Sequence, residues 1–127
     1  MLDTLAKWHE IVKSRDLEAL SDILDVDAVM LSPVVFTPQK GRKITLMYLT
    51  AAFHVLANDS FKYVREIADE NGVILEFETQ VDGIYINGVD MISWNQQGLI
   101  TEFKVMVRPL QALTMLQQKM AEMLERR

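Results

Sequence analysis

The sequence contains no cysteine and only two histidines, His9 and His54, among its 127 residues. Without cysteine the chain has no disulfide, no thiol nucleophile and no zinc site built from thiolates. The two histidines lie far apart in the sequence, so a histidine-rich metal site is not expected. The chain also lacks a glycine-rich phosphate-binding loop. We therefore expect no metal and no cofactor.

Basic charge is scarce as well, since 13 lysines and arginines stand against 18 aspartates and glutamates and leave a net charge of −5. Such a chain offers no basic stripe to neutralise the phosphates of a nucleic acid or to bind an anionic membrane surface. No apolar run approaches the roughly 20 residues that a membrane-spanning helix needs. The N-terminal segment has neither the basic start nor the apolar core of a secretory signal. We expect a cytoplasmic protein that binds neither nucleic acid nor membranes.

Hydrophobic residues, in contrast, make up 50% of the chain, enough for a sizeable core. A length of 127 residues is close to the common size of one domain. No linker, internal repeat or low-complexity segment interrupts the sequence. We therefore expect a single domain over residues 1–127.

The N-terminal half of the chain has mainly helical periodicity. Apolar residues recur at the spacing of one helix face over residues 4–13, and again after Asp16, a typical N-cap, so two helices are expected. The next elements are a short strand over residues 28–31 that ends at Ser32-Pro33, a loop over residues 33–41 and a third helix over residues 42–56.

The C-terminal half changes to the two-residue alternation of β-strands, expected over residues 61–67, 73–81, 84–94 and 99–107. Three dipeptides are typical of tight turns because they tolerate positive φ: Asn71-Gly72, Asp82-Gly83 and Gln97-Gly98. Asn87-Gly88 predicts a bulge or bend inside a strand. Pro109 is a good first residue for a final helix, whose apolar stripe comprises Leu110, Leu113, Leu116 or Gln117, Met120 and Leu124.

Helices segregated from an antiparallel sheet define the α+β class. A long sheet with one apolar face needs helices packed on that face. We expect a cone-shaped, curved antiparallel (mixed) sheet packed on the N-terminal helices, with a C-terminal helix and one apolar pocket inside.

Two blocks of residues carry a resemblance to a known family. The first comprises Asp16 to Leu20, Asp27-Ala28-Val29, Ser32-Pro33 and Gly41-Arg42; the second comprises Asp82-Gly83, Gly88-Val89-Asp90 and Gly98 to Phe103. This ordered set resembles the nuclear transport factor 2-like superfamily and, within it, the SnoaL-like and ketosteroid-isomerase-like branch. The resemblance implies a cystatin-like cone, a pocket between sheet and helices, and frequent dimers. It does not settle a function, because the superfamily includes isomerases, dehydratases, epoxide hydrolases, polyketide cyclases and non-enzymatic binders.

Asp90 is the first candidate for a functional residue. If Leu75 and Phe77 face inward, the pleat also turns Asp90 inward on the next strand, where an apolar environment raises the pKa of a carboxyl. A neutral carboxyl donates a hydrogen bond to a ligand oxygen, and the resemblance places Asp90 at the oxyanion-hole aspartate of ketosteroid isomerases. The alternative is that Asp90 holds the Asn87-Gly88 bend through a side-chain-to-backbone bond.

Two other positions depart from the isomerase pattern. Ser32 stands where the pattern has a carboxylate base, and serine takes no proton from carbon without a partner base. Ser32 therefore either binds a ligand or satisfies the backbone before Pro33. Trp8 stands where the pattern has a tyrosine, and its indole either meets a ligand or packs as plain core. The other expected ligand-binding residues are apolar or aromatic: Leu49, Phe53, Phe77, Trp94, Phe103 and Val105.

Regular alternation places Glu76 and Glu78 on the face opposite the pocket, unless a bulge reverses them. There they are expected to meet Lys104, and Lys62 or Arg65, across the sheet. Met91 and Met106 have the same parity. Apolar residues on this convex face predict a partner, most simply a second copy of the chain in a homodimer. The alternative is that the C-terminal helix covers them.

The sequence thus supports two functions. The first is an enzyme that isomerises or cyclises a small apolar carbonyl compound, with Asp90 as acid or hydrogen-bond donor and with Trp8 and Ser32 orienting the ligand. The second is a module that binds a small apolar organic ligand, or dimerises, without catalysis. The missing base at Ser32 makes a binding or polarising site easier to defend than a complete isomerase.

Overall fold

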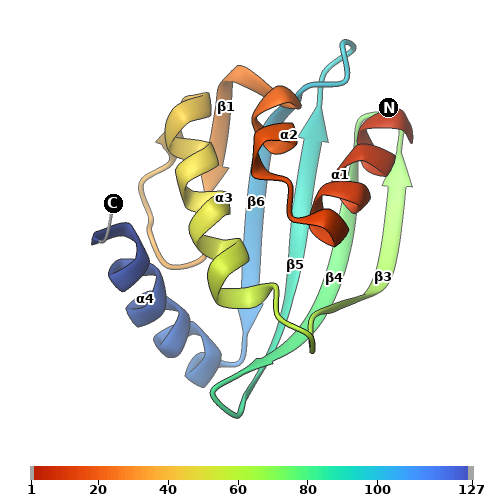
Figure 1. The fold of residues 1–127 in the computed structure, drawn as a ribbon. Coiled ribbons are helices and arrows are strands. Elements are labelled where there is room, and N and C mark those ends of the chain that lie inside the picture. The colour runs from red at the N-terminus through yellow and green to blue at the C-terminus, as the bar shows by residue number, and fades with distance from the viewer. Residues whose placement is uncertain (1, 126–127) are drawn as a thin grey trace.

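In this computed structural model, which describes residues 2–125, helices cover one face of a six-stranded sheet (Figure 1). The helices are α1 (Leu2–Ser14), α2 (Leu17–Asp22), α3 (Arg42–Leu56) and α4 (Leu110–Glu125). The strands are β1 (Leu24–Leu31), β2 (Gln39–Lys40), β3 (Lys62–Asp69), β4 (Gly72–Val81), β5 (Ile84–Trp94) and β6 (Ile100–Arg108). The domain expected over residues 1–127 includes residues 1 and 126–127, which lie outside the described residues.

The strands are ordered β2-β1-β6-β5-β4-β3. Every neighbouring pair is antiparallel except β1 and β6, which run parallel. A mixed sheet with helices on one face confirms the predicted α+β class. The sequence does not predict β2, because a strand of two residues shows no alternation.

The helix boundaries follow the local sequence. Asp16 caps α2 as predicted, since its side chain accepts a hydrogen bond from the Ala19 backbone N–H at 3.2 Å. Gly41 precedes α3 with a φ of 112°, a conformation open mainly to glycine, and α3 covers the predicted residues 42–56. Among the helices of residues 2–125, none has the length and hydrophobicity to cross a membrane.

The glycines in two of the strand connections have different roles: one allows the chain to turn, and the other allows close packing of the backbone. The turn at Asp82-Gly83 is as predicted, with φ values of 53° and 79°. The turn predicted at Asn71-Gly72 is shifted by one residue, since Gly72 already pairs with Asp69 in the sheet. Gly72 is required for close packing, because a Cβ atom there would lie 2.4 Å from the backbone oxygen of Ile92.

The bulge or bend predicted at Asn87-Gly88 is wrong. β5 keeps an unbroken register with β4 through this segment, with Gly88 opposite Phe77. A Cβ atom on Gly88 would lie 2.6 Å from both the Phe77 ring and the backbone oxygen of Met106. Glycine is thus needed here to make room for the Phe77 ring and not to bend the chain.

The irregularity lies instead in the edge strand β3. Tyr63 pairs with Phe77, but Arg65 pairs with the next residue, Glu76, so Val64 is the extra residue of a bulge. A bulge changes which residues of a strand face the core. It gives β3 opposite parity on its two sides, so that Tyr63 faces the helices while Arg65 faces away from them.

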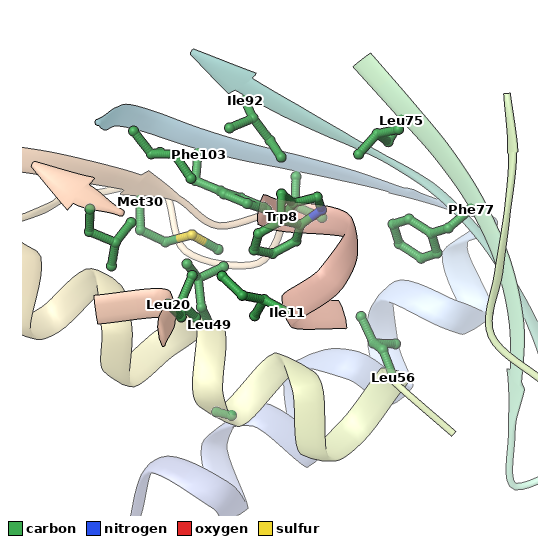
Figure 2. Close-up of a cluster of buried hydrophobic side chains, with 14 of the residues drawn as sticks. Trp8, Ile11, Leu20, Met30, Leu49, Leu56, Leu75, Phe77, Ile92 and Phe103 are labelled. Carbon is green, nitrogen blue, oxygen red and sulfur yellow. The ribbon is translucent and has the colours of Figure 1, made fainter. Parts of the chain in front are cut away.

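The core lies between the helices and the concave face of the sheet (Figure 2). Its largest side chains are at most 2% exposed and come from helices as well as strands: Trp8, Leu20, Leu49, Phe77 and Phe103. The rings of Trp8 and Phe103 lie 5.0 Å apart between centroids. Burial of each such side chain contributes roughly 1.5–3 kcal/mol to stability, so the position of α1 on the sheet is strongly fixed.

The C-terminal helix α4 lies beside α3 on the helix side of the sheet (Figure 1). Its predicted inward stripe is right for Leu116 and Met120, which are buried, and wrong for Leu110, which is 76% exposed. Met106, on the other face of the sheet, is 52% exposed. The alternative in which the C-terminal helix covers the convex methionines is therefore wrong.

Candidate functional site

A cavity lies between the concave face of the sheet and the helices α1, α3 and α4. Its volume is about 640 Å³, the opening to solvent included. Polar groups on its walls belong to Trp8, Ser32, Tyr63 and Asp90, and the other wall residues are apolar. An apolar cavity with a few convergent polar groups is the usual form of a small-molecule site.

The structure brings most of the predicted site residues to the walls of this one cavity. Those that line it are Trp8, Ser32, Leu49, Phe53, Phe77, Asp90, Phe103 and Val105. They come from helices α1 and α3, from strands β4, β5 and β6, and from the loop after β1. Their binding of a ligand stays a prediction.

Trp94 is the exception, and its assignment to the site is corrected. It has the inward parity expected of it, but it lies four residues beyond Asp90, about 13 Å further along the strand at roughly 3.3 Å per residue. Its indole Nε1–H donates to the backbone oxygen of Glu70 at 2.8 Å. Trp94 is therefore a core residue that holds the turn between β3 and β4.

Asp90 lies in the middle of the sheet, opposite Leu75 on one side and Val105 on the other. It is 7% exposed. Burial raises the pKa of its carboxyl to about 7, although a hydrogen bond from Tyr63 acts in the opposite direction. Near neutral pH both the neutral and the charged carboxyl are thus present.

Tyr63 is the site residue that the sequence pattern does not single out. Its hydroxyl donates to Oδ2 of Asp90 at 2.7 Å and accepts a hydrogen bond from Nε1–H of Trp8 at 3.1 Å. Burial, followed by the neighbouring Asp90 charge, holds the pKa of Tyr63 well above its ordinary value, so the phenol stays a neutral donor. The one available signal is a pair of aromatic residues two positions apart, Phe61 just before β3 and Tyr63 at its start.

The alternative role of Asp90, as the brace of a bend at Asn87-Gly88, is wrong. The strand has no bend there, and Oδ2 of Asp90 is bonded to Tyr63. Asn87 is held by its own side chain, whose Nδ2 donates to Glu76 and to the backbone oxygen of Phe77, both at 3.0 Å.

Ser32 lies at the cavity wall, directly after the last residue of β1 that pairs with β6. Its Oγ accepts a hydrogen bond from the Val34 backbone N–H at 3.2 Å, which is the backbone role expected of it. That bond uses an oxygen lone pair and leaves the hydroxyl hydrogen for a ligand. Ser32 stands level with Val105 and Asp90 on the next two strands, so it is about 10 Å from Asp90 at roughly 4.8 Å per strand.

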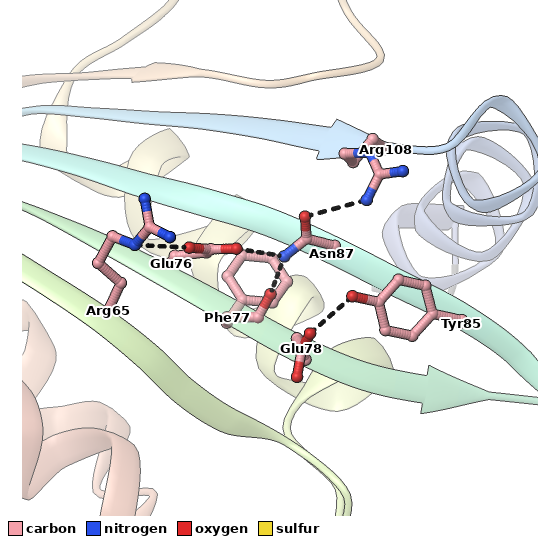
Figure 3. A network of polar contacts seen from close by, with 7 residues as sticks. All are labelled: Arg65, Glu76, Phe77, Glu78, Tyr85, Asn87 and Arg108. Atoms are coloured by element: carbon pink, nitrogen blue, oxygen red, sulfur yellow. Dashed lines mark hydrogen bonds and ion pairs between the residues drawn. The ribbon is translucent and has the colours of Figure 1, made fainter.

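Glu76 and Glu78 point away from the cavity, as predicted (Figure 3). Nε of Arg65 lies 3.2 Å from Glu76, and the Tyr85 hydroxyl donates to Glu78 at 2.7 Å. Arg65 is thus confirmed as one of the expected partners. Asn87 donates to Glu76 as well, at 3.0 Å. Neither glutamate is available as a base inside the cavity.

Among the residues that the structure describes, one carboxyl and one phenol are thus the titratable groups of the cavity. Among residues 2–125, no histidine, lysine, arginine or glutamate lines it. In the part of the chain that the structure describes, no group of three histidine, aspartate or glutamate side chains is placed to hold a metal ion. When Asp90 is neutral it donates a hydrogen bond to an oxygen atom in the cavity, and when it is charged it accepts one.

Known structures share this arrangement of helices and strands. A steroid delta-isomerase from Pseudomonas aeruginosa is 37% identical to this chain, with a TM-score of 0.93 over 98% of this chain and 91% of that one. An uncharacterized protein with a cystatin-like fold from Silicibacter pomeroyi is 28% identical, with a TM-score of 0.86 over 94% of this chain and 83% of that one. The epoxide hydrolase/cyclase-like enzyme SalBIII is 15% identical, with a TM-score of 0.66 over 84% of this chain and 88% of that one, which shows a shared fold alone. No protein-family model and no curated protein sequence matches the chain.

Proposed function

Because this chain belongs to the nuclear transport factor 2-like superfamily, in its SnoaL-like and ketosteroid-isomerase-like branch, we propose that its cavity binds a small, largely apolar organic compound through one oxygen atom at Asp90. The observation that carries the proposal is the buried Asp90 carboxyl in an otherwise apolar wall. A buried carboxyl of raised pKa in a cavity is a frequent mark of a functional site. The relative from Pseudomonas aeruginosa is named as a steroid isomerase, so flat ring ketones are the first ligands to test.

Complete catalysis requires a hydrogen-bond donor and a base, and this site contains only the donor. Neutral Asp90 polarises a bound carbonyl by donating a hydrogen bond to the oxygen on which negative charge develops. Isomerisation also requires a base that takes a proton from carbon, and Ser32 does not supply one. Our proposal therefore puts ligand binding and carbonyl polarisation first, and complete isomerisation or cyclisation second.

Three flat probes of similar size test the proposal: naphthalene, 2-naphthol and 2-acetonaphthone. We expect the two probes that carry oxygen to bind about tenfold more tightly than naphthalene, equivalent to about 1.4 kcal/mol for one hydrogen bond. Asp90→Ala should remove this advantage in isothermal titration. Glu76→Gln is the matched control, because it neutralises a carboxyl of the same sheet on the face away from the cavity. Equal binding of all three probes to the wild-type protein, or no binding, contradicts the proposal.

A second copy of the chain is the partner that we propose for the convex face of the sheet. Ile67, Ile74 and Met106 are 61%, 39% and 52% exposed there. The row of charged and polar contacts in Figure 3, with Arg65 beside Glu76, crosses the same face. Apolar residues beside charges of both signs suit a two-fold interface in which one patch meets its own copy.

The cytoplasmic location expected from the sequence also stays a prediction, which cell fractionation would test.

A further inference from the structure

We propose that Trp8 is a positioning residue that acts on Asp90 through Tyr63. The three side chains form a one-way chain of hydrogen-bond donors, which leaves a single Asp90 oxygen, Oδ1, to meet the ligand. This inference deepens the proposed function and rests on it for the ligand. The chain of donors itself is tested without a ligand, so that the two proposals fail separately.

The direction of the chain follows from its first member. An indole N–H only donates, whereas a tyrosine hydroxyl has one hydrogen to donate and lone pairs to accept. Nε1–H of Trp8 lies 3.1 Å from the Tyr63 hydroxyl, which must therefore accept. The one hydrogen of Tyr63 is then directed to Oδ2 of Asp90 at 2.7 Å. A hydroxyl in place of the indole would leave both directions open.

This direction determines how Asp90 meets a ligand. Because Oδ2 accepts from Tyr63, a proton on the carboxyl sits on Oδ1. Oδ1 has no hydrogen-bond partner in residues 2–125, yet these residues contain no fully buried polar side-chain atom without a partner. Oδ1 therefore keeps some exposed surface, and the space beside it is the cavity. The same atom donates to a ligand when Asp90 is neutral and accepts from a ligand when Asp90 is charged.

The strengths of the two bonds are coupled. A hydrogen bond that Tyr63 accepts from Trp8 polarises the phenol and makes it a better donor, by roughly 10–30% in estimates for such chains. In agreement, the bond from Trp8 lowers the pKa of Tyr63, against the larger opposite effects of burial and of Asp90. Loss of the Trp8 N–H should therefore weaken the bond to Asp90 and raise the pKa of that carboxyl.

Few other polar groups around Asp90 could take the place of Trp8 and Tyr63 in setting its hydrogen bonds. Its neighbours on the adjacent strands are Leu75 and Val105, and the wall residues of α3 and α4 are apolar. Two titratable side chains, His9 and Glu66, lie outside the cavity wall, with Nε2 of His9 2.6 Å from Glu66. The His9 ring centroid is 5.7 Å from that of Tyr63, so His9→Gln is needed as a control.

The first measurement starts from the wild-type protein. The sequence has two tryptophans, Trp8 and Trp94, so a ¹⁵N spectrum shows two indole N–H signals. We expect the Trp8 signal to shift between pH 5 and 9 with the same midpoint as the ¹³C signal of the Asp90 carboxyl. The Trp94 signal should stay constant, because its N–H donates to a backbone oxygen. The shift should persist in His9→Gln and vanish in Asp90→Asn. A Trp8 signal that stays constant, or that shifts with a midpoint different from that of Asp90, overturns the proposal.

The second measurement follows the Asp90 midpoint in variants. Tyr63→Phe should raise it by about one pH unit, the equivalent of one hydrogen bond to a charged group. Trp8→Phe keeps an aromatic ring and should raise the midpoint by a smaller but measurable amount. Trp94→Phe removes the other indole N–H, so it is expected to lower stability and leave the midpoint unchanged. Equal midpoints in Trp8→Phe and Trp94→Phe would mean that Trp8 only packs, and would overturn the proposal. If Trp8→Phe does not fold, the first measurement decides.

The two proposals are distinguished by their readouts. A titrating Trp8 signal without binding of any probe supports the donor chain and contradicts the proposed ligand site. Binding that depends on Asp90, together with a Trp8 signal that does not titrate, supports the ligand site and contradicts the donor chain.

Discussion

The hydroxyl of Tyr63 donates to Oδ2 of Asp90 at 2.7 Å, and this bond joins the edge strand β3 to β5 across the strand β4 that lies between them. It brings a donor from an exposed strand onto the one carboxyl of an apolar cavity. Burial raises the pKa of that carboxyl to about 7, against the effect of the Tyr63 bond. Stability, ligand choice and reactivity should therefore all depend on Asp90, and each dependence has its own test.

Asp90 should make the free energy of unfolding depend on pH. Its pKa is raised from 3.8 to about 7 on folding, so between these values the folded protein holds a proton that the unfolded chain has lost. This contribution is complete below about pH 4 and disappears as the pH rises through about 7. At about 1.4 kcal/mol per pKa unit, its upper bound is about 4.5 kcal/mol.

Urea unfolding at a series of pH values measures this contribution. Relative to Asp90→Asn, the wild-type protein should lose stability between pH 4 and 8, while Glu76→Gln should run parallel to the wild type. A constant difference between the wild type and Asp90→Asn across this range contradicts the raised pKa.

A carboxylate at position 32 should add the base that the cavity lacks. Ser32→Asp places it about 10 Å from Asp90, two strand spacings away. We expect isomerisation of a β,γ-unsaturated ketosteroid to rise at least about 100-fold over the parent chain, since positioned bases contribute 10²–10⁴. Absorbance of the conjugated product measures the rate. Ser32→Asn, of equal size and without charge, is the control and should show no gain. A folded Ser32→Asp protein that binds the ketone without any gain would show that the loss of the base is not what limits the site.

Gly88 should be required because it makes room for the Phe77 ring, and not because it forms a turn. In Gly88→Ala, the new Cβ would lie 2.6 Å from the Phe77 ring and from the backbone oxygen of Met106. We expect a loss of about 1–3 kcal/mol in unfolding free energy, the usual cost of an overpacked core. Phe77→Leu in the same chain should recover part of the loss, because one of the two contacts is relieved. Gly83→Asn is the control, because nothing lies within 4 Å of a Cβ there and asparagine tolerates its positive φ of 79°. Equal losses at both glycines would contradict this role.

The convex face should hold two copies of the chain together. Met106→Glu places a charge on a side chain that is 52% exposed on that face, so it should shift a dimer to monomer in light scattering. Gln118→Glu adds the same charge on an exposed position of α4 and should leave the dimer intact. A wild-type protein that is monomeric at all concentrations would rule out this interface.

The sequence predicts the placement of Asp90 because the strands that carry Leu75 and Asp90 pair without interruption, so parity alone is a reliable guide. It does not predict that of Tyr63, because the bulge at Val64 arises from pairing with β4 and leaves no local pattern. Trp94 shows a second limit: parity gives the face of a strand but not the depth at which a cavity ends.

Asn87-Gly88 shows a third limit, on the meaning of glycine. An Asn-Gly dipeptide is typical of a hairpin turn, but here its glycine makes room for an aromatic ring from the neighbouring strand. Such a contact joins residues of two different strands, and the pattern within either strand does not show it.

The pH dependence of ligand binding tests the role of Asp90 most directly. A ketone such as 2-acetonaphthone only accepts a hydrogen bond and needs neutral Asp90, whereas 2-naphthol donates and favours the charged form. We predict that affinity for the ketone falls, and affinity for the naphthol rises relative to it, as the pH passes through about 7. Asp90→Asn should abolish the difference. A ratio of the two affinities that stays constant from pH 5 to 9 would contradict the assignment of Asp90 as the group that meets the ligand.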